Sequence, residues 1–396
     1  MQSTVQNYYA TCPRGLEPLL EAELTALGGK KIVVTDGGVS FSGDVALSWK
    51  ANLESRVATR ILWRVGQTPY SNEDGIYKQA MALPWPKWFD VSRTIMVKVT
   101  AVKCPLRSLE FVTLRIKDAV CDKFRQINNE RPSVDTREPD IRIHAFLTAT
   151  DCQFYVDTSG AALYQRGNRQ NSVEAPLREN LAAGILKLSG WQPGSPLLDP
   201  MCGSGTFLIE AAMMALDSAP GLKRSFGFEK LKNFDPGAWG EIKKAAFKRV
   251  KPASPMLIFG SDNDSMAVRA ARQNLEAAGL SNVVQVQQLD VLEAPAPVLP
   301  EGMTGTLLTN PPYGERIGES DDLAELYPHL AASLKRNFAG WNAFFLTSDL
   351  RMPKLMRLQP SRKTALFNGP LECRLFEFRM VAGSNRKEAR HDATVE

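Results

Sequence analysis

The sequence predicts an α/β protein: a C-terminal domain with a mostly parallel, doubly wound sheet, preceded by small α+β domains. Two observations predict this. From about residue 176 to residue 380, short apolar runs alternate with helical patterns, whereas the first 160 residues mix hairpins with helices. We expect domains at residues 1–60, 61–160 and 161–382, followed by a flexible polar tail at residues 383–396.

The first 60 residues predict one helix and three short strands. Leucines recur at helical spacing over residues 16–27, and Gly28-Gly29 ends that helix. Asp36-Gly37-Gly38 is typical of a hairpin turn between two β-rich runs. The strands are expected at residues 8–11, 31–35 and 39–42.

Residues 61–160 predict a second unit of the same kind. The run Thr94-Ile-Met-Val-Lys-Val-Thr100 is typical of a strand, and apolar residues at helical spacing predict a helix over residues 109–128. Two further strands are expected at residues 141–148 and 152–157, joined by a tight turn. In both units we expect helices to cover one face of a sheet.

Strands and helices then alternate regularly to about residue 380. Because parallel neighbours need a crossover connection, usually a helix, this alternation predicts a mostly parallel sheet. Strands are expected at residues 197–199, 256–261, 283–287, 305–309, 343–347 and 372–380, and helices at residues 176–188, 206–215, 265–278 and 323–338.

Composition and charge exclude several classes of protein. No apolar stretch approaches the roughly 18 residues that span a bilayer, and the N-terminus lacks the basic and apolar regions of a signal peptide. The six cysteines include no Cys-x-x-Cys pair and there are three histidines, so we expect no metal site and reduced thiols. A cytoplasmic protein is therefore expected. The net charge of +5 permits a polyanionic partner without requiring one.

The first chemical motif is Asp199-Pro-Met-Cys-Gly-Ser-Gly-Thr206, which follows a short predicted strand. Its two glycines let the backbone approach a ligand, but Leu208 stands where a dinucleotide fingerprint has its third glycine. The Asp199 carboxylate would repel phosphate and suits a cationic amine such as that of S-adenosylmethionine (SAM). The alternative is an ordinary turn between a strand and a helix. The candidate cofactor contacts here are Asp199, Pro200, Cys202, Gly203, Gly205 and Thr206.

Acidic residues also follow two later strands, at the same expected edge of the sheet. Asp262, followed by Asn263, is placed to accept hydrogen bonds from ribose hydroxyls, and Asp290 from an adenine amino group. Asp264 is expected to cap the helix that begins at residue 265. A helix cap or a surface charge would explain each acid alone, but three acids at successive strand ends favour a ligand site.

The motif Asn310-Pro-Pro-Tyr313 directly follows another predicted strand. Two consecutive prolines, Pro311 and Pro312, fix a rigid turn. We expect this turn to hold the Asn310 side-chain carbonyl and the Pro311 backbone carbonyl so that they accept both hydrogens of an exocyclic amino group. Tyr313 offers a ring on which a flipped-out base can stack. The alternative is a purely structural turn.

These motifs resemble those of class I SAM-dependent methyltransferases that modify amino groups of nucleic-acid bases. With Tyr164-Gln-Arg-Gly-Asn-Arg169 and the segment 175–183, the chain is similar over most of residues 1–380 to RNA methyltransferases that carry an N-terminal THUMP domain. The resemblance implies a Rossmann-like catalytic domain preceded by ferredoxin-like and THUMP domains. It also implies SAM contacts at Asp199, Asp262, Asp290 and Asn310, and a catalytic target-base site formed by Asn310, Pro311, Pro312 and Tyr313.

The resemblance further implies a reaction and a partner. The expected reaction is methylation of a guanine N2 amine in large-subunit (23S) ribosomal RNA, either free or within a pre-ribosomal particle. Three alternatives stay open: tRNA guanine, DNA adenine N6, and a non-catalytic RNA-binding or assembly factor. The absence of a helix-turn-helix pattern disfavours DNA. The oligomeric state is not predicted.

Two basic stretches are candidates for RNA contact. The first spans residues 93–125. The second spans residues 223–251, where Phe226, Phe228, Phe234 and Trp239 alternate with lysines and would offer stacking surfaces beside phosphate contacts. A solvated amphipathic helix over residues 239–250 explains much of this charge equally well. At the domain junction, Arg166 and Arg169 either steer phosphate or pair with acids of the catalytic domain.

Overall fold

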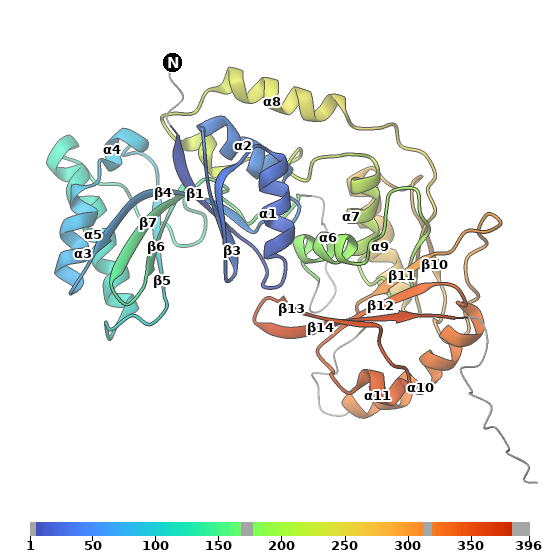
Figure 1. The fold of residues 1–396 in the computed structure, drawn as a ribbon. Helices are drawn as coiled ribbons and strands as arrows, with labels where there is room; N and C mark the ends of the chain where they lie inside the picture. Colours follow the sequence, from blue (N-terminus) through green and yellow to red (C-terminus); the bar gives the residue numbers. More distant parts are fainter. Residues whose placement is uncertain (1–4, 168–176, 312–318, 382–396) are drawn as a thin grey trace, which may run out of the picture.

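The computed structural model describes residues 5–167, 177–311 and 319–381 (Figure 1). Two seven-stranded sheets organise these residues, one in each half of the chain. The predicted α/β class, with small α+β units before a doubly wound domain, is confirmed. None of the described helices is both long and apolar enough to cross a membrane.

The first sheet joins the two N-terminal units into one. Its strands are ordered 2-3-1-4-7-6-5, and its elements are β1 (Gln6–Thr11), α1 (Glu17–Ala26), β2 (Lys30–Thr35), β3 (Gly38–Gly43), α2 (Val45–Glu54), β4 (Arg60–Pro69), α3 (Glu73–Ala82), α4 (Trp85–Trp88), β5 (Ile95–Ala101), α5 (Leu109–Asn128), β6 (Ile141–Leu147) and β7 (Asp151–Asp157). The expected boundary at residue 60 falls at the start of β4, which pairs antiparallel with β1 on one side and with β7 on the other.

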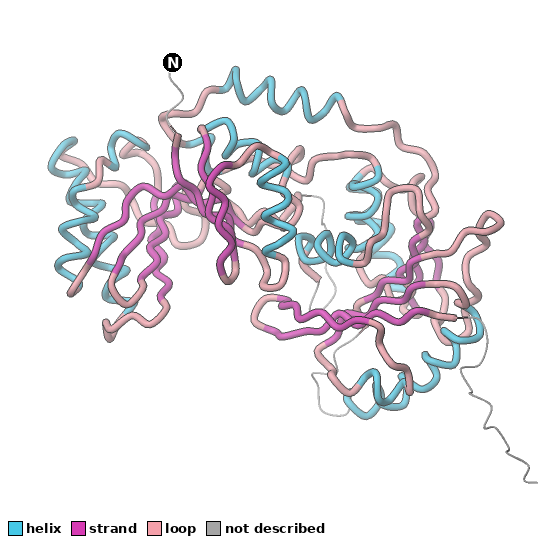
Figure 2. The backbone as a smooth tube through the Cα atoms, viewed as in Figure 1, coloured by secondary structure: helices cyan, strands magenta, loops and turns pink. Residues whose placement is uncertain are grey.

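Helices cover one face of this sheet. Along β6 burial alternates strictly: Ile143 and Ala145 are buried, whereas Arg142, His144 and Phe146 are half-buried. Such alternation marks a sheet with one face in the core and one outside it. Figure 2 shows α3, α4 and α5 gathered on one side of these strands. The core face is therefore the helix-covered face, and the polar face is turned away from the helices.

The second sheet is the predicted parallel sheet. Its order is 10-9-8-11-12-14-13, and its elements are α6 (Glu179–Leu188), β8 (Leu197–Asp199), α7 (Thr206–Ala215), η1 (Gly227–Lys230), α8 (Pro236–Lys248), β9 (Ile258–Asp262), α9 (Ser265–Ala278), β10 (Gln285–Gln288), β11 (Thr306–Thr309), α10 (Glu319–Asn337), β12 (Asn342–Thr347), α11 (Met352–Met356), β13 (Arg362–Asn368) and β14 (Leu371–Arg379). The first five strands pair in parallel, and β14 and β13 complete the sheet antiparallel.

A buried ion pair connects the two halves. Arg166, at the junction, places its Nε 3.2 Å from a carboxylate oxygen of Glu210 on α7, and their side chains are 3% and 0% exposed. Arg166 also donates to the backbone oxygen of Arg56, which follows α2, at 2.6 Å. Of the two roles expected for Arg166, pairing with an acid of the catalytic domain is confirmed. Arg169 lies outside the described residues.

The insertion between α7 and β9 packs against the N-terminal half through its aromatic side chains. Phe226, Phe228 and Trp239 are 3%, 1% and 5% exposed. Phe228 stacks on Trp49 of α2 with ring centroids 5.6 Å apart, and half-buried Phe234 lies edge-on to the same ring. The prediction that these rings stack on RNA is wrong, because they form a hydrophobic core between the two halves.

We predict that truncation destabilises the protein strongly at the core position Phe228 and hardly at all at the surface position Phe247. Phe228→Ala removes a buried ring and should lower the free energy of unfolding by about 3–5 kcal/mol. Phe247 on α8 is 71% exposed, so Phe247→Ala should change it by less than about 0.5 kcal/mol. Urea titrations of both variants check this. Equal, small effects would contradict the packing described for the insertion.

Candidate functional site

Four neighbouring strands bring the predicted site residues to one edge of the second sheet. The strands β10, β9, β8 and β11 lie side by side and run in parallel. Their carboxyl ends therefore meet at the same edge, where ligands of open α/β sheets bind. Just at or beyond those ends the chain places, in spatial order, Asp290, Asp262, Asp199 and Asn310.

The glycine loop between β8 and α7 is held in a tight conformation. Gly203 and Gly205 have φ angles of +51° and +83°, a region that favours glycine. A Cβ on Gly205 would lie 3.3 Å from the Cβ of Ala271 on α9, so the loop packs closely on that helix. Cys202 N–H donates to Ser261 O at 2.9 Å. Of the other candidates, Pro200 is buried and Thr206, the first residue of α7, is 8% exposed.

Asp199 is a desolvated carboxyl at the base of this loop. It is 2% exposed, and one carboxyl oxygen accepts from Met201 N–H at 3.3 Å. Burial, with a smaller contribution from the nearby Asp262, raises the pKa of Asp199 to about 7. Its ionised form is thus costly unless a cation lies beside it. The geometry fits a ligand that brings a positively charged amine.

Asp262 anchors the glycine loop to β9. One carboxylate oxygen accepts from Gly203 N–H at 2.9 Å and the other from Asp264 N–H at 3.1 Å. Burial raises the pKa of Asp262 above its usual value. Asp264 accepts from Met266 N–H at 2.8 Å, so its predicted cap on α9 is confirmed. Asn263 is exposed at the same edge.

The last two predicted positions flank these acids. Asp290 is exposed, and its Oδ1 accepts from Leu292 N–H at 2.8 Å. Asn310 is half-buried and Pro311 is buried directly after β11, whereas Pro312 and Tyr313 lie outside the described residues. The ligand roles of Asp290 and of residues 310–313 therefore remain predictions.

One residue that supports the loop was not predicted from the sequence. Asn274 on α9 is 1% exposed, and its side-chain amide donates to Ser204 O at 3.1 Å. A signal was present, because Asn274 falls on the apolar stripe of α9 with Ala271 and Leu275. A polar residue in such a stripe needs a buried partner, and here the partner is the glycine loop.

The remaining chemistry of the site is limited. Burial raises the pKa of the Cys202 thiol well above its usual value, which disfavours a thiolate nucleophile. Among the described residues no cluster of three or more His, Cys, Asp or Glu side chains could hold a metal ion. The edge therefore presents carboxylates, amide groups and backbone N–H groups.

Three family models match consecutive parts of the chain. They describe the RlmL ferredoxin-like domain over residues 7–62, the THUMP domain over residues 70–157, and an RMKL-like methyltransferase domain over residues 166–377. The last of these covers more than half of the 396 residues.

Curated relatives extend this similarity to nearly the whole chain. A ribosomal RNA large subunit methyltransferase K/L from Aeromonas hydrophila is 39% identical over 98% of this chain and 56% of its own length. A protein of the same name from Psychromonas ingrahamii is 40% identical over 94% of this chain and 50% of its own. The chain thus spans about half the length of these relatives.

Solved structures share the whole architecture. SMU.472, named as a methyltransferase and solved in complex with SAH, is 30% identical with a TM-score of 0.85, covering 97% of this chain and 100% of its own. A predicted N6-adenine-specific DNA methylase from Listeria monocytogenes is 28% identical with a TM-score of 0.84, covering 95% and 96%. With its glycine loop, its acidic strand ends and these matches, the chain belongs to the family of RMKL-like methyltransferases.

Proposed function

We propose that this chain transfers a methyl group from SAM to an exocyclic amine of a base in large-subunit ribosomal RNA, and that this amine is N2 of a guanine in 23S RNA. The observation that carries the proposal is the order of Asp290, Asp262, Asp199 and Asn310 along one sheet edge. An extended cofactor would lie along the three aspartates, and the target base would lie beside Asn310, the last of the four residues.

The described residues fit SAM at this edge. Asp199 would pair with the cationic amine of its methionine part, and this pairing would relieve the burial of the Asp199 carboxyl. Gly203 and Gly205 allow close approach of the loop backbone, and Asp262 and Asp290 would accept from the adenosine part. When bound, SAM supplies an electrophilic methyl group on a sulfonium.

Asn310 and Pro311 would orient the nucleophile. Their two carbonyl oxygens accept both hydrogens of the target amine, which favours a pyramidal nitrogen whose lone pair points out of the base plane. Positioning of this kind, with carbonyl dipoles aimed at the charge that develops on nitrogen, accounts for catalysis without a general base. After transfer the nitrogen is cationic, and it then loses one of its hydrogens as a proton to water. Tyr313 would stack on the flipped-out base.

The choice of substrate rests on the relatives. Those at 39–40% identity are named as ribosomal RNA large subunit methyltransferases, and the THUMP match favours RNA. A ribosomal substrate, free or in a pre-ribosomal particle, places the reaction in the cytoplasm. The name of the Listeria neighbour keeps adenine N6 in DNA as the second candidate, because an Asn-Pro-Pro-Tyr turn suits either amine.

The deciding experiment supplies labelled SAM and purified protein with separate 23S RNA (free and within pre-ribosomal particles), 16S RNA, tRNA and DNA, all lacking the host's modifications. Products are digested to nucleosides and identified by mass. Label as N2-methylguanosine in 23S RNA supports the proposal. Label in tRNA keeps the reaction and moves the substrate, N6-methyladenine in DNA establishes the second candidate, and no label in any polymer refutes a catalytic role.

Two substitutions should separate cofactor binding from catalysis. Asp199→Ala removes the partner of the cofactor amine and should raise the Kd for SAM by about 30-fold or more. Asn310→Ala should leave that Kd within about threefold and lower kcat by at least about 100-fold, because its carbonyl acts on the target amine. Calorimetry and single-turnover assays check both. The reverse pattern would show that the two roles are misassigned.

The raised pKa of Asp199 predicts a pH-dependent stability. The carboxyl ionises near pH 4 when unfolded but at about 7 when folded, so the free energy of unfolding should fall as pH rises through this window. Asp199→Asn removes this loss and should be more stable than the wild type above pH 7, by about 1–4 kcal/mol. Urea titrations across the window test this, with Asp290→Asn as the exposed control. Parallel curves for wild type and Asp199→Asn would exclude the effect.

A further inference from the structure

A groove of about 630 Å³ runs beside α8, which Figure 1 shows on the outside of the molecule. We call it the α8 groove. It is lined by the carboxyl ends of α7 and α9 and by the second half of α8, and its floor includes the buried side chains of Met213, Leu216 and Leu280. Both α7 and α9 begin just beyond the catalytic edge, so the groove lies at the opposite edge of the sheet. A molecule bound there would leave the cofactor and base positions free.

An exposed aromatic ring continues this apolar floor. Phe247 lines the groove and is 71% exposed. Trp239 and Ala246 on the same helix are buried, and Trp239 packs edge-on against the rings of Phe226 and Phe228. These residues attach α8 to the protein without any contribution from Phe247. An apolar recess that extends onto an exposed ring is typical of a surface that another molecule covers.

The residues that line the groove include no acid and four lysines, namely Lys223, Lys243, Lys244 and Lys251. Lys223 donates to Ala277 O and Ala278 O at the end of α9, at 3.3 and 3.2 Å. Lys244 lies 3.7 Å from Glu241, whose side chain is 78% exposed. The carboxyl ends of three helices and Glu241 together offset about 2.5 of the four positive charges. The α8 groove therefore keeps a net positive charge.

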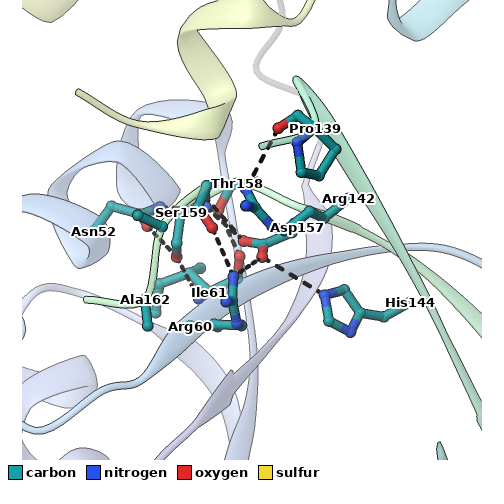
Figure 3. Close-up of polar contacts among 12 residues, drawn as sticks. Asn52, Arg60, Ile61, Pro139, Arg142, His144, Asp157, Thr158, Ser159 and Ala162 are labelled. Carbon is teal, nitrogen blue, oxygen red and sulfur yellow. Dashed lines mark hydrogen bonds and ion pairs between the residues drawn. The ribbon is translucent and has the colours of Figure 1, made fainter. Parts of the chain in front are cut away.

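Cations with a structural role inside this protein have a different setting. Near the end of β7, Arg60 pairs with the fully buried carboxylate of Asp157, which also accepts from Ser159 N–H at 2.8 Å (Figure 3). The charge of Arg60 is thus balanced within the fold. No buried carboxylate lines the α8 groove, so its remaining positive charge suits an acidic partner from outside the chain.

We infer that the α8 groove docks an acidic amphipathic helix of a partner protein. The apolar side chains of that helix lie in the recess beside Phe247, and its carboxylates face the lysines. Binding of an amphipathic helix in an apolar groove is a common mode of peptide recognition, with anchors at helical spacing. The inference does not depend on the proposed reaction, because the groove is remote from the catalytic edge.

Two other occupants suit the α8 groove less well. Unpaired bases of RNA stack on aromatic rings or guanidinium planes, whereas Met213, Leu216 and Leu280 offer an aliphatic floor. A second copy of the same face would bring like charges together, which opposes association. Aliphatic side chains flanked by carboxylates satisfy both the floor and the lysines.

The test uses a synthetic peptide as the probe. A fluorescein-labelled helical peptide carries leucines at positions i, i+3, i+4 and i+7 and glutamates on both sides of them, and its binding to the full chain is followed by anisotropy. A second peptide has lysines in place of the glutamates. The acidic peptide should bind at least about tenfold more tightly than the basic one, and added salt should reduce this difference.

Substitutions assign the binding to the groove. Phe247→Ala should raise the Kd of the acidic peptide by about 10- to 30-fold. The matched control Phe111→Ala, at a 50% exposed position of α5, should leave it unchanged. Lys244→Glu should raise the Kd by about 3- to 10-fold, whereas Lys78→Glu at an exposed position of α3 should not. Thermal unfolding and the Kd for SAM, both expected to match the wild type, show that a variant is folded.

Three results would overturn the inference. They are failure of the acidic peptide to bind the wild type, equal binding of the two peptides, and unchanged binding in Phe247→Ala and Lys244→Glu. A single-stranded oligoribonucleotide is measured in parallel. If it binds in place of the peptide and both variants weaken it, the groove is a nucleic-acid surface. Methyl transfer by Phe247→Ala should match the wild type, so the proposed reaction and the docking site can fail separately.

Discussion

The relation between the two halves of the chain depends on the buried carboxylate of Glu210. It is fully buried and is approached by Arg166 at 3.2 Å and by Arg56 at 4.0 Å. Removing Glu210 would leave two guanidinium groups in the core without their shared carboxylate, which is far costlier than losing a surface ion pair. Glu210 lies one turn into α7, the helix that the glycine loop begins. The same helix therefore fixes both the glycine loop and the position of the N-terminal half.

Ion pairs between the two halves also account for several of the cations in the insertion. In the insertion, Lys230 pairs with Asp140 at 2.6 Å and Arg249 with Glu54 at 2.5 Å. Arg224 donates to the backbone oxygens of Ala161 and Ala162 at 2.6 and 2.7 Å. These three cations contact the N-terminal half, so their charge is explained without an RNA partner.

The sequence predicted regular elements well where burial and local capping agree. Helices α5, α7 and α9 begin and end as expected, because each has an apolar stripe or a marked terminus. Strand β13 was missed, since its residues are mostly exposed or half-exposed and carry no apolar alternation. The single N-terminal sheet was missed for another reason. Strand β4, which joins β1 to β7, was itself not predicted, and which strands pair with it is decided by tertiary packing.

In the insertion, the sequence pattern did not show whether the aromatic side chains are buried or exposed. Lysines interleaved with phenylalanines suit an RNA surface and a domain interface equally, and only packing distinguishes them. The 1% exposure of Phe228 assigns the insertion to the interface. On β6 the opposite holds, because Phe146 falls on the polar side of a strict alternation and stays outside the core. Position within an alternating strand thus says more about the exposure of an aromatic ring than the charges around it do.

The acids of the site were predictable as residues but not in what they contact. The ends of successive strands identified Asp199 and Asp262, since parallel strands end at a common edge. That both oxygens of Asp262 accept backbone N–H groups follows from the loop conformation, which no spacing reveals. Asp199 shows why a candidate ligand site can contain a residue that lowers the stability of the fold. A desolvated carboxyl without a cation lowers stability at neutral pH, and a protein retains one where a ligand supplies the missing charge. This loss of stability arises at Asp199 itself, where a cationic ligand would be recognised.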